Sequence, residues 1–180
     1  MIIAFKKNDV VYLGYDQYIR FEEAGHRFSA KENSKVVRKY NDALAGTIGL
    51  LALNNFMRTA NWLMIEDEKL EYDKLLSNLL TCFRDRREIV NNSSIVIAYK
   101  DKLFLFRDGM DLFELDDFCV CGTGSNYAVG YLYMNFDKEN DPEKLMRDTF
   151  NYTRERVTDI GKDIVMINTR DLEFVEVKKC

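Results

Sequence analysis

Hydrophobic and polar positions near the start of the chain follow the pattern of short β-strands. Residues 1–7 and 10–21 form two such runs, and Asn8-Asp9 between them predicts a hairpin turn. Within residues 10–15 both alternating faces are largely apolar, which predicts a strand that is covered on both sides. Similar patterns predict further strands over residues 35–40, 43–49, 94–99, 103–107, 110–121, 163–169 and 173–178.

Apolar residues recur at three- and four-residue steps in two other parts of the chain, and each part predicts a pair of helices. The first pair covers residues 50–64 and 68–86. The second pair covers residues 125–136, with Ser125 as the predicted N-cap, and a helix after Asp141, where a capping aspartate precedes proline. Two stacked sheets with one helix pair outside each would bury every apolar stripe. The predicted fold class is therefore α+β, a four-layer αββα sandwich.

The composition indicates one folded unit. The 180 residues are 47% hydrophobic, which is enough for a sizeable core, and one proline with nine glycines leaves no room for a flexible linker. We therefore expect a single domain over residues 1–180. The apolar start meets Lys6-Lys7 too soon for a signal peptide, and no stretch approaches the roughly 18 apolar residues of a membrane span. These features predict a cytoplasmic protein with no membrane partner.

Charge and ligand-forming residues exclude several classes of function. Lys and Arg number 26 against 30 Asp and Glu, so the net charge is −4 and no basic excess indicates a nucleic-acid partner. The cysteines have no C-x-x-C spacing, and the single histidine, His26, is remote from them and is predicted to lie in a surface turn. We therefore expect neither a metal site nor a cofactor. The cysteines are Cys82, Cys119, Cys121 and Cys180.

Four segments of the chain resemble the proteasome β-subunit family, and they are most similar to its bacterial relative, the HslV peptidase. They are residues 2–16, which end in an aspartate; residues 33–42, which contain a lysine; residues 45–49, which contain glycines; and residues 121–128, a Gly-x-Gly-Ser turn. The resemblance spans nearly the whole chain. It implies the same αββα sandwich, that of the N-terminal nucleophile (Ntn) hydrolases. It also implies a homo-oligomer, either a ring or a dimer, with an ATPase or a peptide as a further partner.

The chemistry of that family assigns roles to particular residues. An N-terminal threonine hydroxyl attacks the peptide, and its own α-amine takes the proton. A lysine lowers the pKa of that amine, an aspartate holds the lysine, and a glycine N–H stabilises the oxyanion. By position, Asp16 and Lys35 match the aspartate and the lysine. Gly49, or alternatively Gly46, matches the oxyanion glycine, and Thr123 matches the serine of the later turn.

The nucleophile departs from the family pattern. Met1 falls opposite the second residue of the family, and neither its thioether nor the side chain of Ile2 can attack a carbonyl. The leading hypothesis is a catalytically silent subunit with a remnant pocket. Two alternatives stay open: an active hydrolase whose Thr, Ser or Cys precedes Met1 in a precursor, and a non-enzymatic assembly factor on the same fold. Asp16 and Lys35 could equally form an ordinary structural ion pair.

Overall fold

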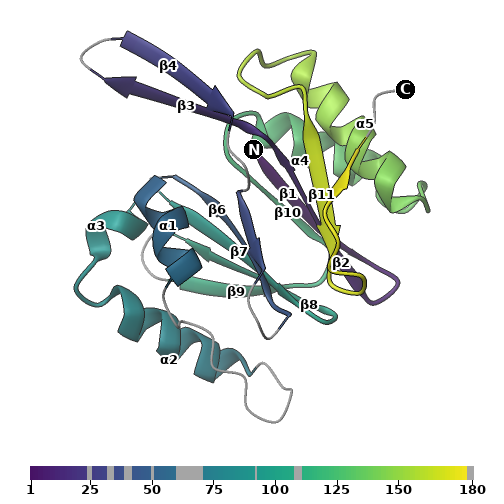
Figure 1. Ribbon diagram of the computed structural model, residues 1–180. Coiled ribbons are helices and arrows are strands. Elements are labelled where there is room, and N and C mark those ends of the chain that lie inside the picture. The colour runs from purple at the N-terminus through teal and green to yellow at the C-terminus, as the bar shows by residue number, and fades with distance from the viewer. Residues whose placement is uncertain are drawn as a thin grey trace.

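Two antiparallel sheets lie face to face in this protein (Figure 1). The computed structural model describes residues 1–23, 26–31, 35–38, 42–49, 51–59, 71–91, 93–107 and 111–177. The first sheet has the order β10-β1-β2-β11-β12, formed by Phe118–Cys121, Ile2–Lys7, Val10–Asp16, Ile164–Asn168 and Val175–Glu176. The second sheet has the order β5-β6-β7-β8-β9, formed by Val36–Arg38, Leu44–Ile48, Ser94–Tyr99, Lys102–Arg107 and Asp111–Leu115.

Helices cover the outer face of each sheet (Figure 1). The second sheet packs against α1 (Leu51–Thr59), α2 (Tyr72–Phe83) and the short α3 (Arg87–Val90). The first sheet packs against α4 (Ser125–Asn135) and α5 (Pro142–Arg154). A third cluster of buried side chains fills the space between the two sheets. These three cores confirm the predicted αββα layers, because each sheet is apolar on both faces.

The prediction that residues 10–15 are covered on both sides is confirmed. Val11, Leu13 and Tyr15 of β2 belong to the core between the sheets. On the opposite face, a Cβ added to Gly14 would lie 2.3 Å from the sulfur of Met146 in α5. The helix therefore packs directly on the backbone of β2, which a larger residue at position 14 would prevent.

The predicted single strand over residues 10–21 is wrong beyond Asp16. The chain leaves the first sheet at Gln17 and continues as β3 (Tyr18–Glu23), which pairs with β4 (His26–Lys31) in a separate two-stranded ribbon that projects from the sandwich (Figure 1). Residues 20–23 include Arg, Glu and Glu, charges that a strand covered on both sides would not accommodate. His26 opens β4, opposite Glu23, rather than lying in a turn.

The predicted continuous strand over residues 110–121 is also wrong, because it is two strands in different sheets. β9 ends at Leu115 and β10 begins at Phe118, so the chain crosses between the sheets at Asp116-Asp117. The backbone there is tied to the first sheet, since the Lys6 N–H donates to the Asp117 carbonyl at 2.7 Å. An exposed acidic pair suits a connection between layers better than a covered strand.

Helix starts were predicted with mixed success. Asp141 does cap α5, accepting from the backbone N–H groups of Glu143 and Lys144 at 2.9 and 3.2 Å. Ser125 does not cap α4: the cap position is Gly124, with φ +82°, and no side chain bonds there. An added Cβ on Gly124 would lie 2.7 Å from Thr153 Cγ2, so close packing on α5 determines this turn.

Among the described residues, none of the helices has the length and apolar character to cross a membrane.

Candidate functional site

Three ionisable groups are buried together where β2 ends. Asp16 is the last residue of β2 and is 1% exposed. Its Oδ1 accepts hydrogen bonds from the α-amine of Met1 and from Lys35 Nζ, the latter at 3.0 Å. The amine is buried, and Lys35 as a whole is only 6% exposed. The structure therefore brings together two of the four predicted site residues, and it adds the α-amine of Met1 to them.

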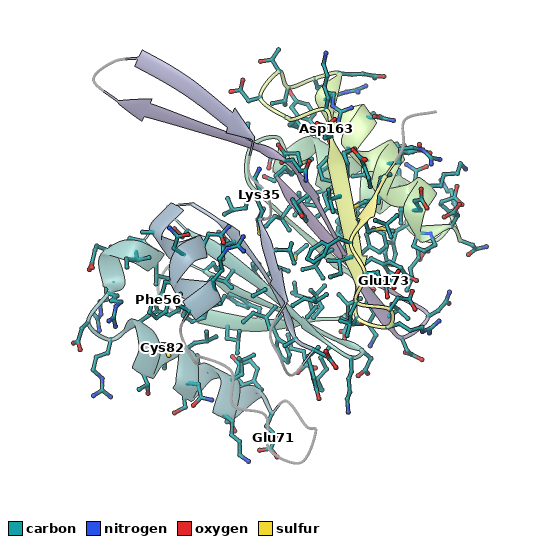
Figure 2. The ribbon with its side chains drawn as sticks, viewed as in Figure 1. Lys35, Phe56, Glu71, Cys82, Asp163 and Glu173 are labelled. Atoms are coloured by element: carbon teal, nitrogen blue, oxygen red, sulfur yellow. The ribbon has the colours of Figure 1, made fainter. Side chains whose placement is uncertain are left out.

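The sheets position these groups from opposite layers. The β1–β2 register, with Ile2 opposite Tyr15, carries Met1 to the level of Asp16, whose N–H donates to the Met1 carbonyl at 3.4 Å. Lys35 comes directly before β5 of the second sheet, and its carbonyl accepts from the Thr47 N–H at 3.1 Å. Figure 2 shows Lys35 between the two halves of the molecule, near the base of the β3–β4 ribbon. The ion pair thus links the two sheets.

The second oxygen of Asp16 is held by a backbone group that the sequence did not reveal. Gly161 N–H donates to Asp16 Oδ2 at 3.0 Å, from the segment that joins α5 to β11. The neighbouring Gln17 N–H donates to the Asp163 carbonyl at 3.0 Å. The contact comes from a backbone donor rather than from a side chain. The glycine itself was the only signal in the sequence.

The buried charges shift one another's pKa values. Burial lowers the pKa of the Met1 amine to about 6, with Asp16 opposing that shift and Lys35 adding to it. Burial alone would raise the pKa of Asp16, but the amine, Lys35 and the Gly161 N–H together lower it below its ordinary value. Near pH 7 the carboxylate is therefore ionised and most of the amine is neutral. A neutral amine beside a charged pair has the state of a general base.

The side chain of Met1 points away from the space between the sheets. It belongs to the core under α4 and α5, together with Ile3 and Phe5, whereas Ile2 belongs to the core between the sheets. Gly122 packs on the Met1 backbone, because an added Cβ at Gly122 would lie 3.2 Å from Met1 Cα. The thioether of Met1 is therefore packed in the core under α4 and α5.

The structure describes the positions of the other predicted site residues, Gly49, Gly46 and Thr123, and their proposed roles stay predictions. Gly49 follows β6 with φ +127°, two residues beyond the Thr47 that bonds Lys35, and an added Cβ would lie 2.1 Å from Ser93 Oγ. Thr123 is exposed in the turn after Gly122. Gly46 lies within β6, where an added Cβ would be 3.0 Å from Ile2 Cδ1. Gly46 therefore allows close contact between the sheets.

Two thiols lie close to the same end of the first sheet. Cys121 of β10 pairs with Ile2, and its thiol is in contact with that of Cys119. The hydrogen bond from Cys119 lowers the pKa of Cys121, and Ser94, Arg107 and the amine act in the same direction against burial. Both thiols are buried, and within the described ranges no group of three or more His, Cys, Asp or Glu side chains could hold a metal ion. Cys180 lies outside the described residues.

Comparison of the whole chain with known proteins defines the class of its fold. No family model matches the chain, and no curated protein is similar to it. Solved structures that resemble it include HslV, and this protein has the HslV/proteasome-like Ntn-hydrolase fold.

Two of those structures illustrate the similarity. One is Thiobacillus denitrificans BPH in complex with epoxomicin, at a TM-score of 0.73 and 16% identity over 99% of this chain and 100% of that chain. The other is HslV from Trypanosoma brucei, at a TM-score of 0.69 and 18% identity over 93% of this chain and 97% of that chain. At such identities the similarity establishes the fold alone.

Proposed function

We propose that this chain is a proteasome-like subunit that acts through self-assembly and binding, and that it cleaves no peptide when Met1 provides the amine beside Asp16. The observation that carries the proposal is the buried cluster of that amine with Asp16 and Lys35. An amine with a pKa of about 6 can accept a proton at pH 7. The thioether of Met1 has neither a proton to give nor a lone pair that forms a stable acyl bond.

Within this proposal the remaining predicted residues complete a remnant pocket. Gly49 would offer its N–H to an oxyanion, and Thr123 would occupy the place of the serine in the family's later turn. Gly49 has a positive φ, so the backbone there departs from the hydrogen-bond pattern of the β-sheet, and this supports an N–H that is available to an oxyanion. The alternative interpretation of Asp16 and Lys35 as an ordinary ion pair predicts that neither Gly49 nor Thr123 affects ligand binding.

A specific observation favours a second candidate, an active hydrolase whose nucleophile precedes Met1. Side chains along β1 alternate between the core under the helices, which holds Met1 and Ile3, and the core between the sheets, which holds Ile2. A residue directly before Met1 would therefore point between the sheets. Lys35, which comes directly before β5 of the second sheet, reaches Asp16 from the opposite layer of the sandwich.

The test separates these two candidates by mass and by turnover. The natively expressed protein is first measured intact, to establish whether Met1 is its first residue. It is then incubated with fluorogenic peptides and with a threonine-directed covalent inhibitor. We expect no turnover and no inhibitor adduct on a protein that begins at Met1. Turnover by such a protein would overturn the proposal, and a native mass with Thr, Ser or Cys ahead of Met1 would establish the second candidate.

A matched pair of extended chains tests whether the pocket itself is competent. One chain carries threonine directly before Met1, exposed by cleavage of an N-terminal fusion, and the other carries alanine there. If Asp16 and Lys35 serve a remnant pocket, the threonine chain gains an inhibitor adduct and the alanine chain does not. If both chains stay unmodified, the ordinary ion-pair interpretation of Asp16 and Lys35 is favoured instead.

The surface of α4 supports the self-assembly part of the proposal. This helix contains no charged residue, although 31% of the chain is charged. Its outer face presents Tyr133, Met134 and Tyr127, which are 80%, 67% and 46% exposed. Gly130 on the same face has nothing within 4 Å of an added Cβ, so a partner backbone can approach closely. Since the chain has a net charge of −4, two copies would meet with least repulsion at this uncharged face.

Light scattering coupled to size exclusion tests the assembly. We expect a ring or a dimer from the native chain, a smaller species from Tyr133→Glu, and no change from the matched Tyr133→Phe. A monomeric native chain would overturn this part of the proposal. A ring with no affinity for peptides would favour the non-enzymatic assembly factor. Three further properties stay predictions: a single domain over residues 1–180, an ATPase partner and a cytoplasmic location.

A further inference from the structure

Arg154, the last residue of α5, binds the segment that follows the helix. Its Nη2 donates to the carbonyl oxygens of Gly161 and Lys162 at 2.7 and 3.1 Å. Its Nη1 donates to Asn151 Oδ1 at 3.2 Å, one turn earlier in α5. Its Nε is buried and has no hydrogen-bond partner among the described residues. The arginine thus fixes two consecutive peptide units to the end of the helix.

The same segment supplies the backbone contacts around Asp16. Gly161 donates its N–H to Asp16 Oδ2 at 3.0 Å while its carbonyl accepts from Arg154. Two residues later, the Asp163 carbonyl accepts from the Gln17 N–H at 3.0 Å. Figure 2 shows Asp163 at the start of β11, toward the end of the molecule where Lys35 lies. A movement of this segment would therefore withdraw the only backbone donor that the described residues place on the Asp16 carboxylate.

We propose that Arg154 is a positioning residue for the Asp16 site: it holds the segment at residues 161–163 so that the Gly161 N–H stays on Asp16 Oδ2 and the carboxylate stays aligned between the Met1 amine and Lys35. The inference rests on the pocket proposed above, and not on whether that pocket cleaves peptides. An arginine suits this role because its planar fork of donors can bind two carbonyl oxygens at once, whereas a lysine offers a single charged point.

Electrostatics supports the same assignment. Burial lowers the pKa of Arg154, and the charges of Asp16 and Asp163 oppose that shift, so the guanidinium lies within electrostatic range of the Asp16 carboxylate. Among the described residues, Lys35 and Arg154 interact electrostatically with this carboxylate, and Lys35 and Cys121 interact with the amine. Removing Arg154 therefore takes away a nearby positive charge and loosens a backbone donor, and both changes raise the pKa of Asp16.

The test measures the titration of Asp16 by carboxyl 13C NMR in the full chain. We expect Arg154→Met to raise the pKa of Asp16 by about one unit, and Arg154→Lys to restore part of that shift because it keeps the charge without the fork. Arg156→Met is the matched control. Arg156 lies beyond the same helix end, and its guanidinium donates to the Tyr152 carbonyl at 2.7 Å rather than to the 161–163 segment. Its loss should leave Asp16 unchanged.

Two results would overturn the inference. One is an Arg154→Met chain that is less stable to urea but titrates at Asp16 as the native chain does, which would make Arg154 merely structural. The other applies if that variant does not fold: it is an Arg154→Gln chain, which also lacks the charge and the fork of donors, that titrates at Asp16 as the native chain does. Failure of the proposed function is distinguishable, because peptide cleavage by a chain beginning at Met1 would leave these titrations as they are.

Discussion

The β1–β2 hairpin carries charged residues at both of its ends, which are buried at one end and exposed at the other. At one end, Asp16 is 1% exposed and binds the Met1 amine and Lys35. At the turn end, Lys6 lies 3.8 Å from Asp101, with side chains 27% and 55% exposed. Charges in the first group interact strongly because water is excluded from them, whereas those in the second group are screened. One end of the hairpin therefore carries charges whose burial costs desolvation free energy, and the other end carries charges that stay in water.

Hydrogen bonds of Thr169 join the turn end of the hairpin to the neighbouring β7–β8 turn. Thr169 Oγ1 donates to the Lys100 carbonyl at 2.5 Å and accepts from the Val11 N–H at 3.1 Å. Asn8 and Asp9 adopt φ of 52° and 58°, as in a two-residue hairpin of type I′. A shallow groove of about 270 Å³ opens there between the turns. These contacts are exposed or partly buried, whereas Asp16 and Lys35 are buried, and the proposed pocket would account for that burial.

Asp16→Asn should have the largest effect on the contrast between the two ends. The substitution leaves Lys35 and the amine buried without an anion, so we expect the free energy of unfolding in urea to fall by about 3–5 kcal/mol. Asp101→Asn at the turn end is the matched control, with the same change of charge and little expected loss. Similar losses for both variants would remove the distinction between buried and exposed charge.

The pH dependence of stability should follow the Met1 amine. Its pKa is about 6 in the folded chain against 8.0 for a free amine, so the unfolded chain takes up the proton first as the pH falls from 8. The free energy of unfolding should therefore decrease between pH 8 and pH 6, by on the order of 2 kcal/mol, with no further loss from this group below pH 6. Urea denaturation across that range measures it, in a His26→Gln background so that the chain contains no histidine.

A flat profile from pH 8 to pH 6 would show that the amine is not buried beside Asp16. An N-terminally acetylated chain provides the control, since it has no amine to titrate and should lose the slope.

Lys35→Met should raise the pKa of the Met1 amine. Lys35 lowers the pKa of the amine, so its removal should raise that pKa from about 6, by about one unit or roughly 1.4 kcal/mol. The 13Cα shift of Met1 followed against pH measures it. The control is Lys6→Met, which removes an ammonium of the same kind from the turn end. An equal shift in both variants would mean that the amine responds to overall charge rather than to its neighbour.

Much of the fold could be predicted because it depends on local patterns. The β1–β2 hairpin follows from alternating apolar residues on either side of Asn8-Asp9, and the start of α5 follows from Asp141, whose cap is a contact within three residues. The predictions fail where packing between layers determines the local structure. Gly124 rather than Ser125 caps α4 because α5 leaves no room for a Cβ, and nothing near Ser125 in the sequence indicates that neighbour.

The candidate site was predictable only through the family resemblance. Asp16 and Lys35 have no local pattern that sets them apart from other charged residues, and the resemblance alone paired them. The Gly161 N–H could not have been found in this way, because a backbone donor has no side-chain signature and lies 145 positions from Asp16. Arg154 was missed for a related reason: its partners are backbone carbonyls of a segment whose path depends on the whole first sheet.

The exposed pair at the turn end should contribute least of all. Lys6 and Asp101 are accessible to water, so screening and the entropy of two long side chains offset their attraction. A double-mutant cycle with Lys6→Met and Asp101→Asn should give a coupling energy below about 0.5 kcal/mol in urea denaturation, and added salt should reduce it further. A coupling above about 1 kcal/mol that persists in salt would place a strong ion pair at this end as well. Buried charge would then no longer distinguish the Asp16 end, and the functional interpretation of that cluster would lose its main physical support.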